Sequence, residues 1–219
     1  MLVLALDTAS PTVSVALHDG TSVVASVTGA DAMHHGEQLA PAVARALADA
    51  GRAVRDVTAV AVGVGPGPFT GLRVGVVTAR TLAASLGVPV HGVCSLDVVA
   101  EQARVDGRTG RFCVATDARR KEVYWAAYDA DGDRVRRTDG PQVARAADLA
   151  VTLGPDVPVL GRGADLYADD LARVGGPADP DAGVLAALVA GGRADVVDPE
   201  PLYLRRPDAV PPGARKRAS

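Results

Sequence analysis

Residues 2–10 read LVLALDTAS, and this stretch sets the start of the fold. The apolar run at 2–6 is typical of a strand buried on both faces, and Asp7 opens a polar turn. Apolar and polar residues then alternate over 13–18. Asp19 with Gly20 can form a tight hairpin turn before the next apolar run at 23–27. The sequence therefore predicts three consecutive antiparallel strands.

A strand, helix, strand crossover follows this hairpin. Residues 37–50 have the apolar spacing of an amphipathic helix, Gly51 suits its left-handed C-terminal cap, and Pro41 is expected to limit its regular first turn. A strand at 59–62, a loop at 63–71, a helix at 72–86 and a strand at 88–93 come next. Because such a crossover joins parallel strands, we expect the two strands to pair in parallel.

The second half of the chain repeats the order of the first. After a polar, glycine-containing stretch at 104–110, the pattern predicts strands at 112–116, 123–128 and 134–137, with Asp117 at the end of the first. A helix at 143–149, a strand at 157–160, a Gly161 to Gly163 turn into a helix, and a helix at 181–190 follow. We predict domains at 1–103 and 104–206 and a disordered basic tail at 207–219.

Composition excludes several classes of protein. The 219 residues are 48% hydrophobic, enough for a sizeable core, and their formal net charge of −3 lacks the positive excess of a free-standing nucleic-acid-binding protein. Cys94 and Cys113 end apolar runs, which favours reduced, packed thiols. No apolar stretch reaches the roughly 18 residues of a membrane span and no basic leader is visible, so we expect a cytoplasmic protein without membrane contact.

Five motifs carry a family resemblance that covers nearly the whole chain. They are LALDTAS at 4–10, HHGEQL at 34–39, GVGPGPFTGLR at 63–73, DARRKEVY at 117–124 and PLYLR at 201–205. Together they resemble the TsaB (YeaZ) family, the dimerisation subunits of the complex that transfers threonylcarbamoyl to N6 of adenosine 37 in tRNAs reading codons that begin with A. The loop at 63–73 is the most specific of the five.

The resemblance implies an α/β fold of two ribonuclease H-like units, as in the sugar kinase, heat-shock and actin (ASKHA) superfamily. It also implies that the chain is not an enzyme but a scaffold and activator. Its expected partners are the catalytic paralogue TsaD, the ATPase TsaE that it helps recruit, and a second copy of itself when isolated, with tRNA met only indirectly. By the same resemblance the helices beginning at Glu37 and Leu72 form the interface. The expected contact residues are Glu37, Leu39, Val43, Arg73, Val74, Val77, Thr78 and Thr81.

The helix at 72–86 supports an interface on its own pattern. One apolar stripe, which includes Val76, suits packing on the helix's own sheet, while a second face around Val77 is made of small or apolar residues. A helix that is apolar nearly all round needs cover on both sides. That cover could be another chain or the second domain.

The alternative from another class is a small-molecule kinase or ATPase of the same superfamily that uses Asp7 and Asp117. The residues of a vestigial nucleotide site would be Asp7, Thr8, Ser10, Asp117, Gly161 and Gly163. However, Ala9 stands where a glycine would let backbone amides approach a phosphate, and Asp117 is followed by no glycine. The loop at 63–71 matches neither the P-loop nor the dinucleotide fingerprint, which favours a rigid connector over a phosphate cradle. Gly161 and Gly163 fit either an adenosine-binding turn or a plain structural turn.

Metal and protease chemistry lack their motifs. His18, His34, His35 and His91 do not form the helical pair, spaced four apart, by which catalytic relatives bind a metal. His34 and His35 are adjacent, so capping the first helix is the favoured use. Neither a zinc-protease helix nor a nucleophilic serine motif is present in the sequence. We therefore expect no metal and no cofactor.

Overall fold

The computed structural model describes residues 1–30 and 35–205. Its first sheet has the strand order β10-β5-β4-β1-β2-β3. Strand β1 pairs antiparallel with β2 and parallel with β4, which in turn pairs parallel with β5, as the crossover predicts. The strands are β1 Val3–Asp7, β2 Thr12–His18, β3 Val23–Ala30, β4 Ala59–Gly63, β5 Val90–Val93 and β10 Val196–Val197.

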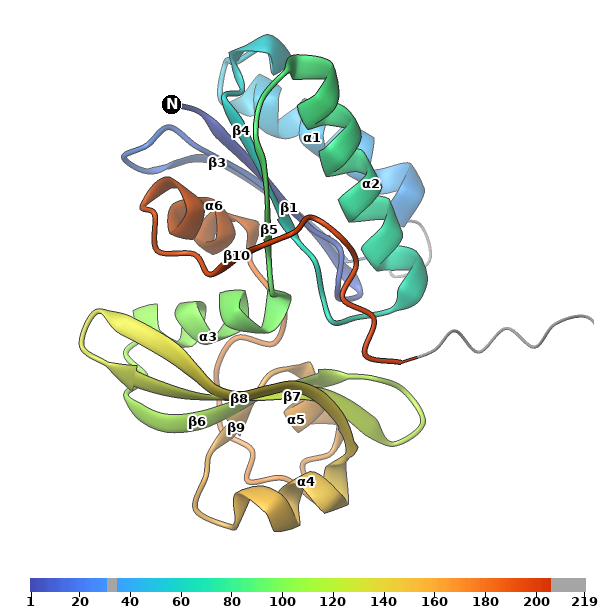
Figure 1. Ribbon diagram of the computed structural model, residues 1–219, viewed down its shortest axis with the longest axis vertical. Helices are drawn as coiled ribbons and strands as arrows, with labels where there is room; N and C mark the ends of the chain where they lie inside the picture. Colours follow the sequence, from blue (N-terminus) through green and yellow to red (C-terminus); the bar gives the residue numbers. More distant parts are fainter. Residues whose placement is uncertain (31–34, 206–219) are drawn as a thin grey trace, which may run out of the picture.

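Helices cover both faces of this sheet (Figure 1). Helices α1 (His35–Asp49) and α2 (Phe69–Leu86) pack on one face, and α6 (Ala182–Ala190) packs against β1 and β2 on the other. Helix α2 ends where expected, with Gly87 as a left-handed cap at φ 67°. A short 3₁₀ turn, η1 (Val54–Asp56), precedes β4.

The second sheet repeats the start of the first. Its order is β8-β7-β6-β9, in which β6 pairs antiparallel with β7 and parallel with β9. Strands and helices are β6 Gly110–Asp117, β7 Glu122–Asp131, β8 Arg134–Arg145, β9 Val159–Leu160, α4 Ala146–Leu153 and α5 Arg162–Leu166. The shared strand order confirms the predicted α/β fold of two ribonuclease H-like units.

Three local predictions differ from the structure. Pro41 lies inside α1, which begins six residues before it at His35, so the proline does not disturb the start of the helix. Strand β8 runs to Arg145, so the expected helix at 143–149 begins only at Ala146 as α4. Helix α3 (Ser95–Val105) was not predicted, and it lies between the two sheets (Figure 1).

The last described elements, α6 and β10, return to the first unit. Helix α6 packs on the first sheet and β10 pairs antiparallel with β5, although the sequence pattern assigned residues 104–206 to one second domain. The reason is that the inner face of the first sheet, around Val3 and Ala5, requires an apolar cover, which Leu185 and Ala186 supply. The tail predicted at 207–219 lies outside the described residues.

Among the described residues, none of the helices is long and apolar enough to cross a membrane.

Candidate functional site

The polar turn after β1 is sealed inside the protein. Asp7 is completely buried; its Oδ1 accepts a hydrogen bond from the Ala9 N–H at 2.8 Å, and its Oδ2 accepts one from Ser95 Oγ at 2.7 Å. Burial raises the pKa of Asp7 to about 7, although these two hydrogen bonds lower it in part. The Thr8 hydroxyl donates to Gly71 O at 2.8 Å, and Ser10 Oγ bonds locally to Thr12. The three predicted phosphate-turn side chains therefore already have partners within the protein.

The loop between β4 and α2 covers this turn. A Cβ atom added at Gly63 would lie 1.7 Å from Asp7 Oδ2, and one added at Gly67 would lie 2.1 Å from Ala9 O. Ser95 Oγ also accepts the Gly65 N–H at 3.1 Å, which ties the loop to the same network. The glycines thus serve close backbone packing, and a phosphate or metal could reach Asp7 only if the loop moved away.

Asp117 and the glycine turn of the second unit also have internal contacts. Asp117 Oδ1 accepts the Arg119 N–H at 2.7 Å, and Oδ2 lies 3.4 Å from Arg119 Nε. Cβ atoms at Gly161 and Gly163 would lie 2.4 and 2.9 Å from Ala115 O, so both glycines let the turn pack on β6. A hollow of about 220 Å³ is lined by Asp117 but not by Asp7. The structure does not bring the two aspartates into one open site.

The outer faces of α1 and α2 carry most of the expected interface residues. Glu37, Arg73, Val77 and Thr81 are exposed, and Val74 and Thr78 are half-buried. Leu39 and Val43 are only 1% and 7% exposed because they form the inner stripe of α1 in the core. Their assignment to the interface was therefore wrong.

A C-terminal segment missed by the interface prediction runs beside α2. Tyr203 stacks on Phe69 with ring centres 4.7 Å apart, and its hydroxyl accepts a hydrogen bond from Arg73 Nε at 2.9 Å. The Arg73 guanidinium also lies 4.0 Å from the centre of the Phe69 ring. The PLYLR motif at 201–205 was the sequence signal for this segment, but its contact with α2 is visible only in the structure.

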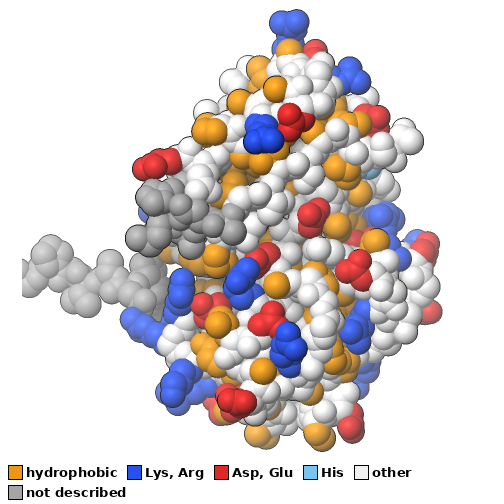
Figure 2. All heavy atoms as spheres, turned by 180° about the vertical axis from the view of Figure 1, so that it is seen from behind, with side chains coloured by type: hydrophobic (Ala, Val, Ile, Leu, Met, Phe, Trp, Pro, Cys, Tyr) orange, Lys and Arg blue, Asp and Glu red, His pale blue; other side chains and the backbone are white. Residues whose placement is uncertain are grey.

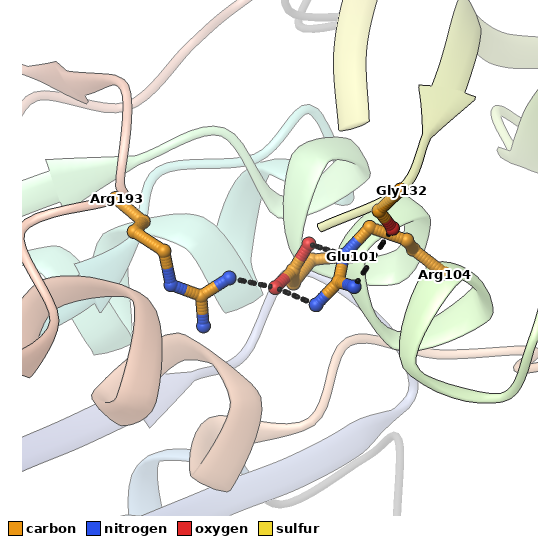
Figure 3. Close-up of polar contacts among 4 residues, drawn as sticks. All are labelled: Glu101, Arg104, Gly132 and Arg193. Carbon is orange, nitrogen blue, oxygen red and sulfur yellow. Dashed lines mark hydrogen bonds and ion pairs between the residues drawn. The ribbon is translucent and has the colours of Figure 1, made fainter. Parts of the chain in front are cut away.

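A second hollow of about 450 Å³ lies between the units, beside α3. Glu101 of α3 is 2% exposed and accepts hydrogen bonds from Arg104 at 2.7 and 2.9 Å and from Arg193 at 2.6 Å (Figure 3). Burial would raise the pKa of Glu101, but the two guanidinium groups outweigh burial and hold that pKa below its usual value. Sequence reasoning did not find this cluster, because Glu101 and Arg193 are 92 residues apart.

Side chains that could perform metal or thiol chemistry are dispersed or inert. Within residues 1–30 and 35–205, no three His, Cys, Asp or Glu side chains gather as metal ligands. His18 Nδ1 accepts the Gly20 N–H at 3.0 Å, while His91 lies on β5; His34 is outside the described residues. Cys94 and Cys113 are buried free thiols, and burial raises the pKa of each to about 12.

Comparison with known proteins points to one group. The family model described as TsaD, tRNA N6-adenosine threonylcarbamoyltransferase, matches residues 24–181. An uncharacterized protein of Mycobacterium tuberculosis is 46% identical, covering 95% of this chain and 94% of its own. The tRNA threonylcarbamoyladenosine biosynthesis protein TsaB of Escherichia coli is 34% identical, covering 94% and 95%. The structure of YeaZ from Pseudomonas aeruginosa has a TM-score of 0.81 at 31% identity, covering 93% of this chain and 99% of that one.

Proposed function

Since the chain belongs to the TsaB (YeaZ) family and so has a role in tRNA threonylcarbamoyladenosine biosynthesis, we propose that it is a non-catalytic scaffold and activator in that pathway. In this proposal it binds the catalytic paralogue TsaD through the outer faces of α1 and α2. It helps recruit the ATPase TsaE to the assembled pair, works in the cytoplasm, and forms a homodimer when isolated.

The outer face of α2 is the observation that carries the proposal. Val77 is 60% exposed, whereas its neighbour Val76 is 1% exposed and belongs to the core. Thr81 and Ala84, one and two turns further along, are also exposed. The side chains on this face are therefore small or apolar except for Arg80, which pairs with Glu200. Among residues 1–30 and 35–205, the second unit packs below α3 and does not cover this face (Figure 1). Such a face allows another pair of helices to approach closely.

The sealed turn around Asp7 supports a non-catalytic role. A kinase or ATPase that used Asp7 would need the carboxylate to meet a metal or phosphate, yet Gly63 and Gly67 bring the loop into contact with the turn. Asp117 is paired with Arg119 and lines a different space. These contacts favour the scaffold over the ATP-using alternative.

The match to the TsaD family model supports pairing with a paralogue. It covers residues 24–181, which include α1, α2 and most of the second unit. Two chains with the same helix pair can form a pseudo-symmetric interface in which each contributes the same elements, as in a homodimer. A surface that binds a second copy is therefore suited to bind TsaD.

The experiment that tests this function is depletion and rescue in the cell of origin. Depletion should lower threonylcarbamoyladenosine in tRNAs that read codons beginning with A, and the full chain should restore it, as measured by mass spectrometry of digested tRNA. TsaD should co-purify with the tagged chain. The isolated chain with Mg²⁺ should neither bind ATP in isothermal titration nor hydrolyse it. Unchanged modification after full depletion, or ATP turnover that Asp7→Ala abolishes, would refute the proposal.

A further inference from the structure

The hairpin turn between β6 and β7 has an unusual backbone. Arg119, Arg120 and Lys121 are consecutive and have φ of 62°, 55° and 62°, the left-handed region that glycine and asparagine normally occupy. The turn is closed by hydrogen bonds from the Ala118 N–H to Glu122 O and from the Glu122 N–H to Arg119 O, both 3.0 Å. The sequence thus places three long basic side chains where the backbone favours other residues. Strain of this kind is often kept at functional sites.

The basic side chains of this turn lie at the protein surface, where Arg119 is paired with Asp117 at 3.4 Å. Arg119, Arg120 and Lys121 are all exposed. Arg145 is the register partner of Glu122 on β8 and is exposed as well, so it extends the basic surface. Figure 2 shows Lys and Arg side chains at the left of the lower half of the molecule, with Asp and Glu side chains among them and further Lys and Arg at its right. Because the whole chain has a net charge of −3, attraction for a polyanion must come from such a local surface.

An aromatic hollow lies beside the turn. Its volume is about 220 Å³, and its lining includes the rings of Phe69, Tyr124 and Tyr203, the arginines Arg119 and Arg205, and Asp117. Arg119 is paired with Asp117 and Arg205 with Glu122. Tyr203 stacks on Phe69 and is still 40% exposed. Arg205 donates a hydrogen bond to Ala118 O at 2.8 Å, which fixes the C-terminal segment against the turn. Unstacked bases of single-stranded RNA are held on aromatic rings beside guanidinium groups. Because Tyr124 is only 8% exposed and Phe69 already contacts Tyr203 and Arg73, Tyr203 is the ring that offers this surface.

We propose that this turn and hollow contact a single-stranded region of the tRNA substrate directly. Phosphates would lie against Arg119, Arg120 and Lys121, and an unstacked base would lie in the aromatic hollow. The inference rests on the proposed function, which supplies the RNA, and goes beyond the indirect contact that the family resemblance implies. The hollow favours single-stranded RNA over an acidic protein segment, which would need the charges but not the aromatic rings.

The test compares two double variants that remove the same charge. Arg120→Asn with Lys121→Asn neutralises the turn while keeping residues that tolerate the left-handed conformation. Arg134→Asn with Arg136→Asn removes two exposed arginines from β8, which begins at the opposite end of β7, and serves as the control. Both are made in the full chain, alone and with TsaD. Binding of an unmodified tRNA transcript that reads a codon beginning with A is followed by fluorescence anisotropy over a range of salt concentrations.

The turn variant should bind this tRNA about tenfold more weakly at about 0.1 M salt, and its slope of log affinity against log salt should shrink by about 1.4 for two lost phosphate contacts. The control should stay within about twofold of the wild type. The melting midpoint of the turn variant should match or exceed that of the wild type, because asparagine relieves the backbone.

Other results would overturn the inference. Equal weakening in both variants would mean general charge attraction, and a lower melting midpoint would mean that the turn residues hold the fold. Intact tRNA binding with lost TsaD binding would assign the turn to a protein partner. These failures differ from failure of the pathway role, in which the wild-type chain itself would not restore the modification in depleted cells.

Discussion

At the scale of one residue, Asp7 occupies a position that resembles a catalytic one, but its contacts hold the fold together. Its carboxylate joins β1 to α3 through Ser95, and Ser95 in turn holds the loop before α2 through the Gly65 N–H. Three segments distant in sequence therefore meet at one buried acid. In the sequence, an aspartate at the end of a buried strand indicates a functional turn. The loop that covers Asp7 is visible only in the structure, so the sequence alone could not show that this position is structural.

The buried acid predicts a specific dependence of stability on pH. The folded-state pKa of Asp7, about 7, lies above the usual 3.8, so the folded chain holds this proton more tightly than the unfolded chain. The stabilising contribution is therefore complete below about pH 4 and is lost as the pH rises to about 7. In Asp7→Asn this contribution disappears. The difference in unfolding free energy between wild type and variant should then change by up to about 1.4 kcal/mol per pH unit in that range.

Urea unfolding of both proteins at pH values from 4 to 8 measures this difference. The other carboxylates titrate equally in both proteins and cancel in the comparison. Parallel stability curves across the whole range would show that Asp7 remains ionised in the folded chain.

At the scale of one element, α2 has two faces, one packed on the core and one on the outside of the protein. Val76 and Ala79 pack into the core, while Val77 points away from it. The C-terminal segment contacts the outer side of the helix through Arg73 and Tyr203 at one end and through the Arg80 and Glu200 ion pair, 3.7 Å apart, further along. The remaining outer surface between these contacts is what a partner helix could cover.

Val77→Glu should abolish association of the chain with itself and with TsaD while the chain stays folded. A carboxylate at this exposed position remains hydrated in the monomer, but burial in an interface would cost several kcal/mol, which exceeds the modest net surplus of a typical interface. Binding should weaken by at least about a hundredfold, as measured by light scattering after size exclusion and by pull-down.

Val76→Glu is the matched control because the neighbouring side chain is buried. It should lose its circular dichroism signal and unfold, since an unpaired charge would enter the core. Should Val77→Glu remain fully assembled, or unfold as Val76→Glu does, the outer face of α2 is not the interface.

The same elements show how far sequence reasoning reaches. The 3.6-residue period of α2 separates the buried Val76 and Ala79 from the exposed Val77 and Thr81, but Val74, which was placed on the outer face, packs against the core. Leu39 and Val43 were misplaced because the resemblance assigned α1 to the interface without distinguishing its faces, although both residues belong to the apolar stripe that packs in the core. Helix α3 was missed because the charged Glu101 stands within its buried surface. Helix α6, which is apolar on nearly all sides, gave no indication of which sheet it would cover.

At the scale of the whole molecule, polar contacts brace the two units at several places along their boundary. Thr12 of β2 donates a hydrogen bond to Asp179 at 2.9 Å, and Asp179 accepts another from Arg162 Nε at 2.8 Å. Near the basic turn, Arg205 bonds to Ala118 O, and beside α3 Glu101 binds Arg193. Enzymes that close around a ligand need units that move relative to each other. A braced boundary suits a scaffold that presents fixed surfaces to its partners.

The Glu101 cluster gives the sharpest test of this bracing. In Glu101→Gln only one acceptor oxygen remains for the guanidinium groups of Arg104 and Arg193. The new amide N–H would face a guanidinium N–H, and two donors cannot bond to each other. A buried polar contact between α3 and the segment after α6 is therefore lost. The unfolding free energy should fall by about 2–3 kcal/mol, less than the 3–5 kcal/mol typical of fully buried pairs because the Arg193 side chain is 45% exposed. Asp49→Asn, which breaks the exposed Arg45 pair, should cost at most about 0.5 kcal/mol.

The pH dependence separates bracing by charge from simple packing. Because the folded-state pKa of Glu101 lies below its usual value of 4.5, its contribution is present above about pH 4.5 and is lost as the pH falls through the lower folded-state value. Wild type and Glu101→Gln should therefore converge in stability as the pH falls below 4.5 in urea unfolding. Amide hydrogen exchange at pH 7 should show reduced protection in both α3 and residues 191–197, since the lost contact joins them. If Glu101→Gln is as stable as Asp49→Asn at pH 7, the buried ion pairs do not hold the two units together and apolar packing around α3 alone must do so.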